Sequence, residues 1–460
     1  MNFLRTHKVE IFIFALALTA RLIYFGLSYQ AQNGDLIATI SGADGYFTVS
    51  QNLILGNGLS SDQGPPYTPY SFRPPLYHFF IAGAHALFGG YGGVIFFQIL
   101  IASFLPVLGM RLASYLVESR KIILALGIIL SLEPSAILYS VFFYAETFFM
   151  FWFFISLLYL FKYLKDRQLI YLALSAFLLG LATLTRPTTE YVPLIIVAVL
   201  LWAERKNIFS RKILINSGVY VAVFLITISP WVYRNYTVFG VPGISPQAGV
   251  NLYTTLLPTV YSIEKGTTFQ EEFAALMASG VRGPNDAYIT DGKKYKEIAI
   301  PILVNHPKGL FLSALNSGLS FFTLDGTFDF LRHIKIRPRE MIGKPSLVAL
   351  FSDPASVGAY FSRNLNGPLA FILLGRLLWI GITILFLFGV WRYIVSRGAV
   401  PQAMAALMII FYFGLISLIA GFGLTARYRL PVNSLIVTFA LYGVATLAPF
   451  FWRKARLLYA

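Results

Sequence analysis

The sequence predicts an all-α, polytopic integral membrane protein with about ten transmembrane helices, further juxtamembrane helices and two large outer loops. Only 12% of the residues are charged and 57% are hydrophobic, whereas soluble domains carry roughly 25% charged residues. Several apolar runs reach the roughly 20 residues that a helix needs to cross a bilayer. Much of the folded surface is therefore expected to face lipid.

The net charge of +16 does not indicate a nucleic-acid-binding protein. The basic residues lie mostly in short clusters between apolar runs, where they orient transmembrane helices. We place in the cytoplasm the clusters Arg5–Lys8, Arg111–Lys121, Lys162–Arg167, Arg205–Lys212, Arg392–Arg397 and Arg453–Arg456. The predicted helices are then 9–28, 93–117, 122–140, 147–164, 169–185, 188–202, 213–229, 370–391, 401–420 and 429–450, and both termini are cytoplasmic.

Two apolar segments are expected to lie along the outer membrane surface, because a span at either place would invert the clusters that follow. These segments are 74–90 and 308–324. The outer loops are then 29–92, with a short helix over 45–55, and 230–369. The chain is accordingly divided into an N-terminal transmembrane catalytic region (1–229), a large outer region (230–369) and C-terminal transmembrane helices (370–460).

Five arginines violate the charge rule, because they lie at outer helix ends or in the first outer loop: Arg73, Arg186, Arg234, Arg427 and Arg429. A guanidinium is a planar fork that suits phosphate oxygens. The five could together bind a lipid phosphate, or each could simply reach the headgroups from a helix end. Arg21, inside the first predicted helix, is expected to do the latter.

Carboxylates are scarce near the membrane. Asp44 lies in the first outer loop and is a candidate general base, although it could instead cap the 45–55 helix. Glu146 lies at the outer end of the 147–164 helix, where the helix dipole alone could favour it. Glu133 is expected within the 122–140 helix as a paired acid, and Asp35 is a reserve for the base.

The order of short motifs resembles the GT-C superfamily of membrane glycosyltransferases, in particular the bacterial branch related to protein O-mannosyltransferases and aminoarabinose transferases. The resemblance covers nearly the whole chain and depends on motif order at outer helix ends. The motifs are Asp44-Gly45-Tyr46, Asn52-Leu53, Gly56-x-Gly58, Arg73-Pro74-Pro75-Leu76-Tyr77, Phe88-Gly89, Leu184-Thr185-Arg186-Pro187, Pro230-Trp231-x-x-Arg234-Asn235-Tyr236, Phe239-Gly240, Gly249-x-Asn251-Leu252-Tyr253 and Arg427-Tyr428-Arg429-x-Pro431.

The resemblance implies transfer of a sugar from a polyprenyl-phosphate donor to a lipid, glycan or protein acceptor, with inversion, on the periplasmic face of the bacterial inner membrane. It implies that an acid of the first outer loop is the base, which we assign to Asp44, with Tyr46 fixing the loop. Many relatives place this acid four residues before the tyrosine, where this chain has Gly42. Glu146 is expected to line the cavity and to bind the sugar or a divalent metal.

Elementary chemistry agrees with this interpretation. Inversion needs one base, and the leaving phosphate needs its charge stabilised, which preorganised arginines do. Two alternatives remain: a lipid-linked oligosaccharide polymerase or ligase, and a transporter or lipid flippase without chemistry. A transporter is expected to carry polar residues at mid-membrane on broken helices, whereas here they lie at outer helix ends.

Overall fold

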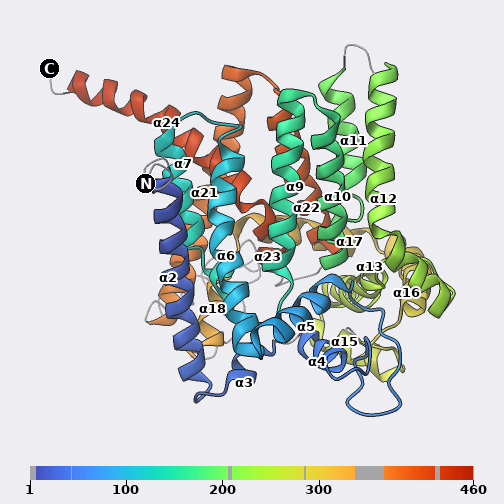
Figure 1. Ribbon diagram of the computed structural model, residues 1–460. Helices are drawn as coiled ribbons and strands as arrows, with labels where there is room; N and C mark the ends of the chain where they lie inside the picture. The colour runs from blue at the N-terminus through green and yellow to red at the C-terminus, as the bar shows by residue number, and fades with distance from the viewer. Residues whose placement is uncertain are drawn as a thin grey trace.

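The computed structural model describes residues 7–42, 44–205, 210–283, 286–336, 367–419 and 425–458, and this part of the chain is helical without a strand. Seven helices in it are long and apolar enough to cross a membrane, and they form the upright bundle of Figure 1. They are α2 (Lys8–Ala31), α6 (Tyr91–Ala113), α9 (Glu146–Asp166), α12 (Arg211–Phe239), α21 (Pro368–Arg397), α22 (Pro401–Ile419) and α24 (Asn433–Leu458). The apolar stretch that includes α24 begins before this helix, at Ala426. The chain is a multi-pass membrane protein.

The other three predicted spans are shorter apolar helices, so the count of about ten remains a prediction. They correspond to α10 (Leu169–Thr185), η1 (Pro187–Thr189) with α11 (Val192–Ala203), and the pair α7 (Arg120–Ser131) and α8 (Pro134–Leu138). The prediction of one helix over 122–140 was wrong. Pro134 begins α8, and the Glu133 side chain caps it by accepting from the Ala136 N–H at 2.5 Å. Proline suits the first turn of a helix but cannot donate within one.

The helix predicted over 213–229 extends beyond its predicted end. Helix α12 continues through Pro230 and ends at Gly240, whose φ of 71° closes the helix. The extra turns are anchored by Trp231, whose Nε1 donates to the Ile244 carbonyl at 2.8 Å, and by Asn235, whose Nδ2 donates to the Gly243 carbonyl at 2.9 Å. The helix therefore extends to Phe239 rather than to residue 229.

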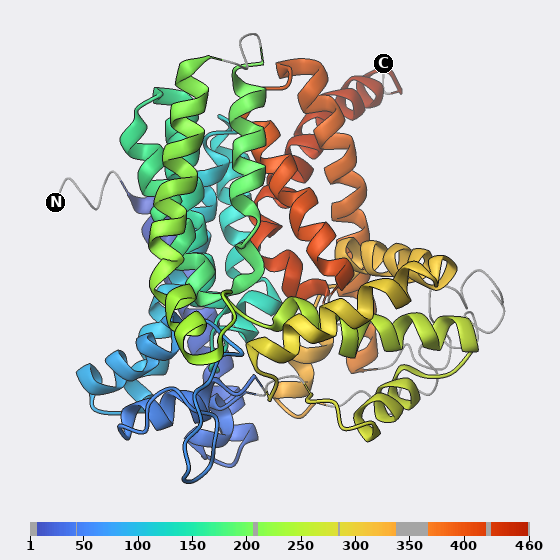
Figure 2. The same ribbon diagram turned by 90° about the vertical axis from the view of Figure 1, so that its right-hand side faces the viewer.

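The two predicted outer loops lie at the same end of the bundle (Figure 2). The first contains α3 (Leu36–Ile40), α4 (Tyr46–Ile54) and α5 (Leu76–Phe88), which confirms the helices expected over 45–55 and 74–90. The second contains α13 (Gln247–Asn251), η2 (Leu252–Leu256), α14 (Leu257–Lys265), α15 (Phe269–Ala278), α16 (Ile289–Val304), α17 (Pro307–Thr323) and α18 (Thr327–His333). Helix α17 matches the segment expected over 308–324. Residues 284–285 and 337–366 of this loop lie outside the described residues.

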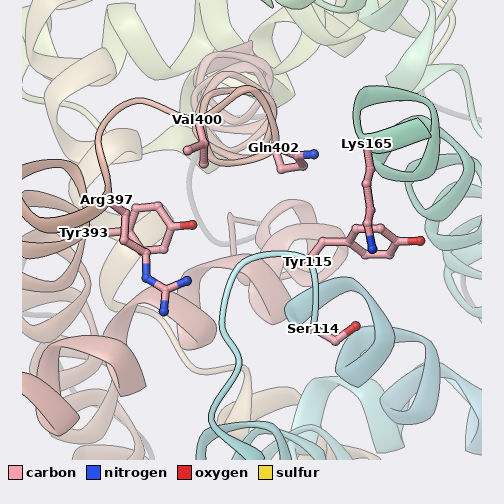
Figure 3. A pocket seen from close by; sticks show the side chains of 7 residues that line it. All are labelled: Ser114, Tyr115, Lys165, Tyr393, Arg397, Val400 and Gln402. Atoms are coloured by element: carbon pink, nitrogen blue, oxygen red, sulfur yellow. The ribbon is translucent and has the colours of Figure 1, made fainter. Parts of the chain in front are cut away.

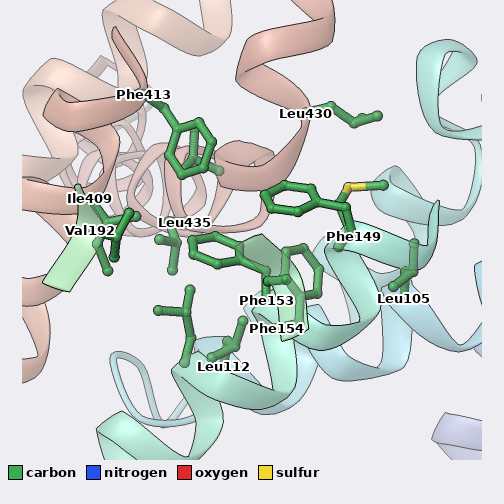
Figure 4. Packing of buried hydrophobic residues seen from close by; sticks show 14 of the residues in the cluster. Leu105, Leu112, Phe149, Phe153, Phe154, Val192, Ile409, Phe413, Leu430 and Leu435 are labelled. Carbon is green, nitrogen blue, oxygen red and sulfur yellow. The ribbon is translucent and has the colours of Figure 1, made fainter. Parts of the chain in front are cut away.

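The apolar core is centred on α9 and closed by α6, α22 and α24 (Figure 4). Phe149, Phe153 and Phe154 of α9 are buried, and the Phe153 ring lies 5.4 Å from the Phe413 ring of α22 and 5.6 Å from the Phe149 ring. A second tight contact joins α21 and α24, where a Cβ at Gly389 would overlap the Phe439 carbonyl. Small residues allow such close approach of membrane helices. The core fixes the first turn of α9, which carries part of the candidate site, and the start of α24, which follows another part of it.

Candidate active site

Two acids and one arginine from distant parts of the chain meet at the end of the bundle that carries the two predicted outer loops. Asp44 precedes α4, Glu146 is the first residue of α9, and Arg427 lies in the short helix α23 (Thr425–Arg429). The Arg427 guanidinium donates through Nη2 to Asp44 Oδ2 and through Nε to Glu146 Oε1. Its Nη1 also lies 3.4 Å from Asp44 Oδ1. One guanidinium therefore joins both acids.

Two further arginines complete this charge cluster. Arg73 donates through Nε to the Asp44 carbonyl at 2.8 Å, and its Nη2 lies 3.5 Å from Asp44 Oδ2. Arg186, which follows α10, donates through Nη1 to Glu146 Oε1. The Glu146 side chain is only 1% exposed and that of Asp44 is 14% exposed. The five side chains carry three positive and two negative charges, so the cluster has a net charge of +1.

Glycines determine the path of the Asp44 loop. Gly42 and Gly45 have φ of 62° and 75°, which disfavour residues with a side chain. A Cβ at Gly42 would lie 3.0 Å from the Tyr144 ring and 3.4 Å from the Phe143 carbonyl. An acid at position 42 would therefore strain this loop, which gives a physical reason for the departure from the family pattern noted above.

Asp44 is not the cap of the helix that follows it. Gly45 occupies the N-cap position of α4, and no side chain caps this helix. Burial alone would raise the pKa of Asp44, but the nearby charges of Arg427 and Arg73 outweigh it and lower the pKa to about 2. The carboxylate is therefore ionised and fully engaged with guanidinium groups in this state.

Aromatic rings surround the arginines. The Arg73 guanidinium lies 4.8 Å from the ring of Tyr46, so Tyr46 supports Arg73 as well as the loop. The Arg427 guanidinium lies 4.5 Å from the Tyr144 ring and 5.5 Å from the Tyr139 ring. Cation–π contacts of this kind favour a charged guanidinium. Sequence reasoning missed Tyr139 and Tyr144, because their aromatic character does not stand out in a chain that is 16% aromatic.

Two of the five predicted phosphate-binding arginines do not join the cluster. Arg429 is 0% exposed and donates to Asn433 Oδ1 at 3.0 Å, to the Phe321 carbonyl at 2.7 Å and to the Leu324 carbonyl. Arg234 donates to the Tyr70 carbonyl and to Asn235 Oδ1, each at 2.8 Å. Both guanidinium groups thus bind the protein itself, so we leave them out of the phosphate site.

The reserve acid, Asp35, also lies outside the cluster. It caps α3 by accepting from the Ala38 N–H at 3.0 Å, and this contact is exposed. Glu133 is used as the cap of α8. Of the four acids singled out from the sequence, Asp44 and Glu146 alone belong to the cluster with the arginines.

The donor set of the cluster does not fit a divalent metal. The described residues hold no group of three His, Cys, Asp or Glu side chains that could bind one. The two acids present, Asp44 and Glu146, both bind Arg427, whose positive charge repels a cation at the same oxygens. Both acids are therefore used to hold Arg427.

A cavity of about 460 Å³ lies at the other end of the bundle (Figure 3). It is lined by Ser114 and Tyr115 beyond α6, by Lys165 near the end of α9, and by Tyr393 and Arg397 of α21. The candidate site lies at the opposite end of α9, at its first residue. This cavity is therefore not part of the arginine–carboxylate cluster.

Comparisons with known proteins found one family match and several structures of similar fold. The dolichyl-phosphate-mannose-protein mannosyltransferase family model matches residues 72–233, which include Arg73, Glu146 and Arg186. The fold is similar to that of an oligosaccharyltransferase from Archaeoglobus fulgidus tethered with an acceptor peptide, at a TM-score of 0.50 and 13% identity over 97% of this chain and 50% of that chain. The same archaeal enzyme with an inhibitory peptide and a dolichol-phosphate matches with a TM-score of 0.47 and 14% identity over 96% of this chain and 52% of that one.

ArnT from Cupriavidus metallidurans, bound to undecaprenyl phosphate, matches with a TM-score of 0.37 and 13% identity over 96% of this chain and 80% of that chain. No curated protein matches this chain in sequence. This chain spans about half the length of the archaeal enzymes. The family match thus covers residues 72–233, and the likeness to the archaeal enzyme is one of fold.

Proposed function

We propose that the chain transfers a sugar from a polyprenyl-phosphate donor to a hydroxyl acceptor, with inversion, on the periplasmic face of the bacterial inner membrane. The observation that carries the proposal is the cluster in which Arg427 joins Asp44 and Glu146, with Arg73 and Arg186 beside it. Structures of two similar proteins hold dolichol-phosphate and undecaprenyl phosphate. The donor class proposed here has the same lipid-phosphate chemistry.

The charge of the cluster suits the leaving group. The donor is a phosphodiester with one negative charge, and cleavage of its bond to the sugar leaves a phosphate monoester that carries up to two. A cluster with a net charge of +1 binds the product phosphate more strongly than the substrate. Such preferential binding of the charge that develops in the transition state accelerates the reaction. Arg427, Arg186 and Arg73 are the proposed phosphate-binding residues.

Asp44 is the proposed base. The acceptor hydroxyl attacks the anomeric carbon, its proton passes to Asp44, and the polyprenyl phosphate departs with the electron pair of the broken bond. The phosphate and Asp44 compete for Arg427, so donor binding weakens the pairing of Asp44 with Arg427. Loss of that pairing raises the pKa of the carboxylate and makes it a stronger base. Glu146, with one buried oxygen unpaired among the described residues, keeps Arg186 and Arg427 in place.

The test compares Asp44→Asn with Asp35→Asn, which removes an acid of the same loop that lies outside the cluster. Turnover of a labelled polyprenyl-phosphate sugar is measured in membranes, with thermal stability measured in parallel. Asp44→Asn should lower turnover roughly 100- to 10,000-fold, while Asp35→Asn should retain it. Near-normal turnover in Asp44→Asn would remove Asp44 as the base. A wild-type protein that moves the lipid across the membrane without transferring its sugar would point to a flippase.

A further inference from the structure

A small cavity lies inside the bundle, and its lining includes none of the residues of the arginine–carboxylate cluster. It measures about 20 Å³, and a cavity needs roughly 10–15 Å³ to hold one water molecule. Its polar lining consists of Arg21 from α2, Glu133 before α8, and Asn433 and Ser434 at the start of α24. The remaining lining is mostly apolar, from α6, α7 and α9. There is room for about one water molecule.

Four of the residues that line this cavity carry buried polar atoms without partners among the described residues. Arg21 Nε and Nη2, Glu133 Oε1, Asn433 Nδ2 and Ser434 Oγ are buried and have no hydrogen-bond partner among the described residues. The four side chains that carry these atoms are at most 6% exposed. Buried polar groups are almost always hydrogen-bonded. The presence of such atoms on residues around one small space indicates a ligand that satisfies them.

Charge decides which ligand fits. Arg21 brings a positive charge and Glu133 a negative one, so an anion would be repelled by Glu133 and a cation by Arg21. A water molecule is neutral, accepts two hydrogen bonds and donates two. It can accept from Arg21 and Asn433 and donate to Glu133 and Ser434, in keeping with the hydrogen-bonding capacity of each group.

The cavity is connected to the turn that carries Arg427. Asn433 offers its Nδ2 to the cavity and its Oδ1 to Arg429 Nε at 3.0 Å. Arg429 also binds two carbonyls of the outer region, and its guanidinium lies 3.4 Å from the Trp379 ring centroid. Arg429 follows Arg427 by two residues in α23. The position of Asn433 is therefore transmitted to the backbone of the Arg427 turn.

We infer that this cavity binds one ordered water molecule that joins Arg21 and Glu133 to Asn433, and that Asn433 and Arg429 are positioning residues for Arg427. The water site stands on the cavity and the unpaired atoms alone. The positioning role rests on the proposed function, because it acts through Arg427.

A double-variant cycle and an experimental density map test the water site. Arg21→Met and Glu133→Gln should each lower the thermal unfolding midpoint in detergent. The double variant should lower it by less than the sum, because the shared network is broken only once. Additive shifts would overturn the network. If a variant does not fold, an experimental density map of the wild-type protein decides. The map should show density for a water molecule within hydrogen-bond distance of Glu133 and Asn433. A well-resolved cavity without such density would refute the water site.

Binding of polyprenyl phosphate tests the positioning role. Asn433→Leu should weaken binding and raise the KM for the sugar-carrying donor roughly 10- to 100-fold, with a smaller effect on kcat. Thr438→Val is the matched control, because Thr438 is equally buried on α24 and donates to the Ser434 carbonyl at 2.6 Å. Asn433→Asp keeps the oxygen that accepts from Arg429 and should restore most of the affinity.

Binding by Asn433→Leu equal to that of Thr438→Val would overturn the positioning role. Failure of the proposed function looks different. In that case the wild-type protein itself would bind no polyprenyl phosphate, while coupling between Arg21 and Glu133 in the thermal cycle would still report the water network.

Discussion

Arg427 and Glu146 are in direct contact although 280 residues separate them in the chain, and the same Arg427 guanidinium also holds Asp44. Arg186 binds the same Glu146 oxygen from a third direction. Because the fork of one arginine spans two acids, the geometry of the cluster depends on a guanidinium and not merely on a positive charge. This relationship makes Arg427 the most informative residue to change.

Arg427→Lys should lower kcat/KM roughly 100-fold or more, in the range seen when one preorganised donor of a developing anion is lost. The ammonium group keeps the charge but cannot bind both acids in the planar arrangement of the guanidinium. Arg234→Lys is the matched control. It should lower thermal stability, because it loses bonds to the Tyr70 carbonyl and Asn235 Oδ1, yet leave donor affinity largely intact in the protein that folds. Equal loss of donor affinity in both variants would contradict this assignment.

The pH dependence of stability should report Asp44. Its pKa is lowered from 3.8 to about 2 in the folded protein, so folding favours the ionised carboxylate. The resulting stabilisation, about 2 kcal/mol, should be fully present above pH 4 and lost as the pH falls toward 2. Thermal midpoints of wild type and Asp44→Asn should therefore differ at pH 6 and converge near pH 2. A difference that persists unchanged at pH 2 would mean that the ion pairs of Asp44 do not stabilise the fold.

The sequence predicts the helices better than the cluster, for physical reasons. Hydropathy and charge determine which segments span and which ends are outer, and these signals are local. Asp44, Glu146 and Arg427 were each singled out as residues at outer ends, but their meeting depends on how α9 and α24 pack, which no local pattern reports. Arg427 and Arg429 looked equivalent in sequence. Residues two apart on a helix point to different sides, so Arg427 reaches the cluster and Arg429 reaches the Phe321 and Leu324 carbonyls at the C-terminal end of α17.

Chelation of divalent metals should leave turnover unchanged. Asp44 and Glu146 bind Arg427, and the described residues offer no third acid or histidine with them. The measurement is sugar transfer in membranes treated with EDTA, compared with untreated membranes and with membranes given back magnesium or manganese. Loss of activity on chelation that is reversed by one metal would show that the acids rearrange around a cation during catalysis.

Single-cysteine labelling should report the topology, since the chain has no cysteine of its own. An impermeant thiol reagent applied to intact cells should label cysteines placed at Ser61 and Ser279, which are exposed in the two outer loops. It should not label a cysteine at Ser210, which caps the other end of α12. Labelling at Ser210 in intact cells, with none at Ser61, would reverse the orientation and move the cluster to the cytoplasmic face.

Gly42→Ala should lower both stability and turnover, because position 42 combines a φ of 62° with close contact to Tyr144. An alanine at such a backbone angle costs about 1 kcal/mol or more, and relief of the strain would move Asp44 away from Arg427. Gly64→Ala is the control in the same loop, since a Cβ there meets nothing within 4 Å. The same geometry predicts that Gly42→Asp cannot rescue Asp44→Asn, although many relatives carry their acid at that place. Restored turnover in the Gly42→Asp, Asp44→Asn double variant would show that the loop can present a base from either position, and that Gly42 does not constrain it.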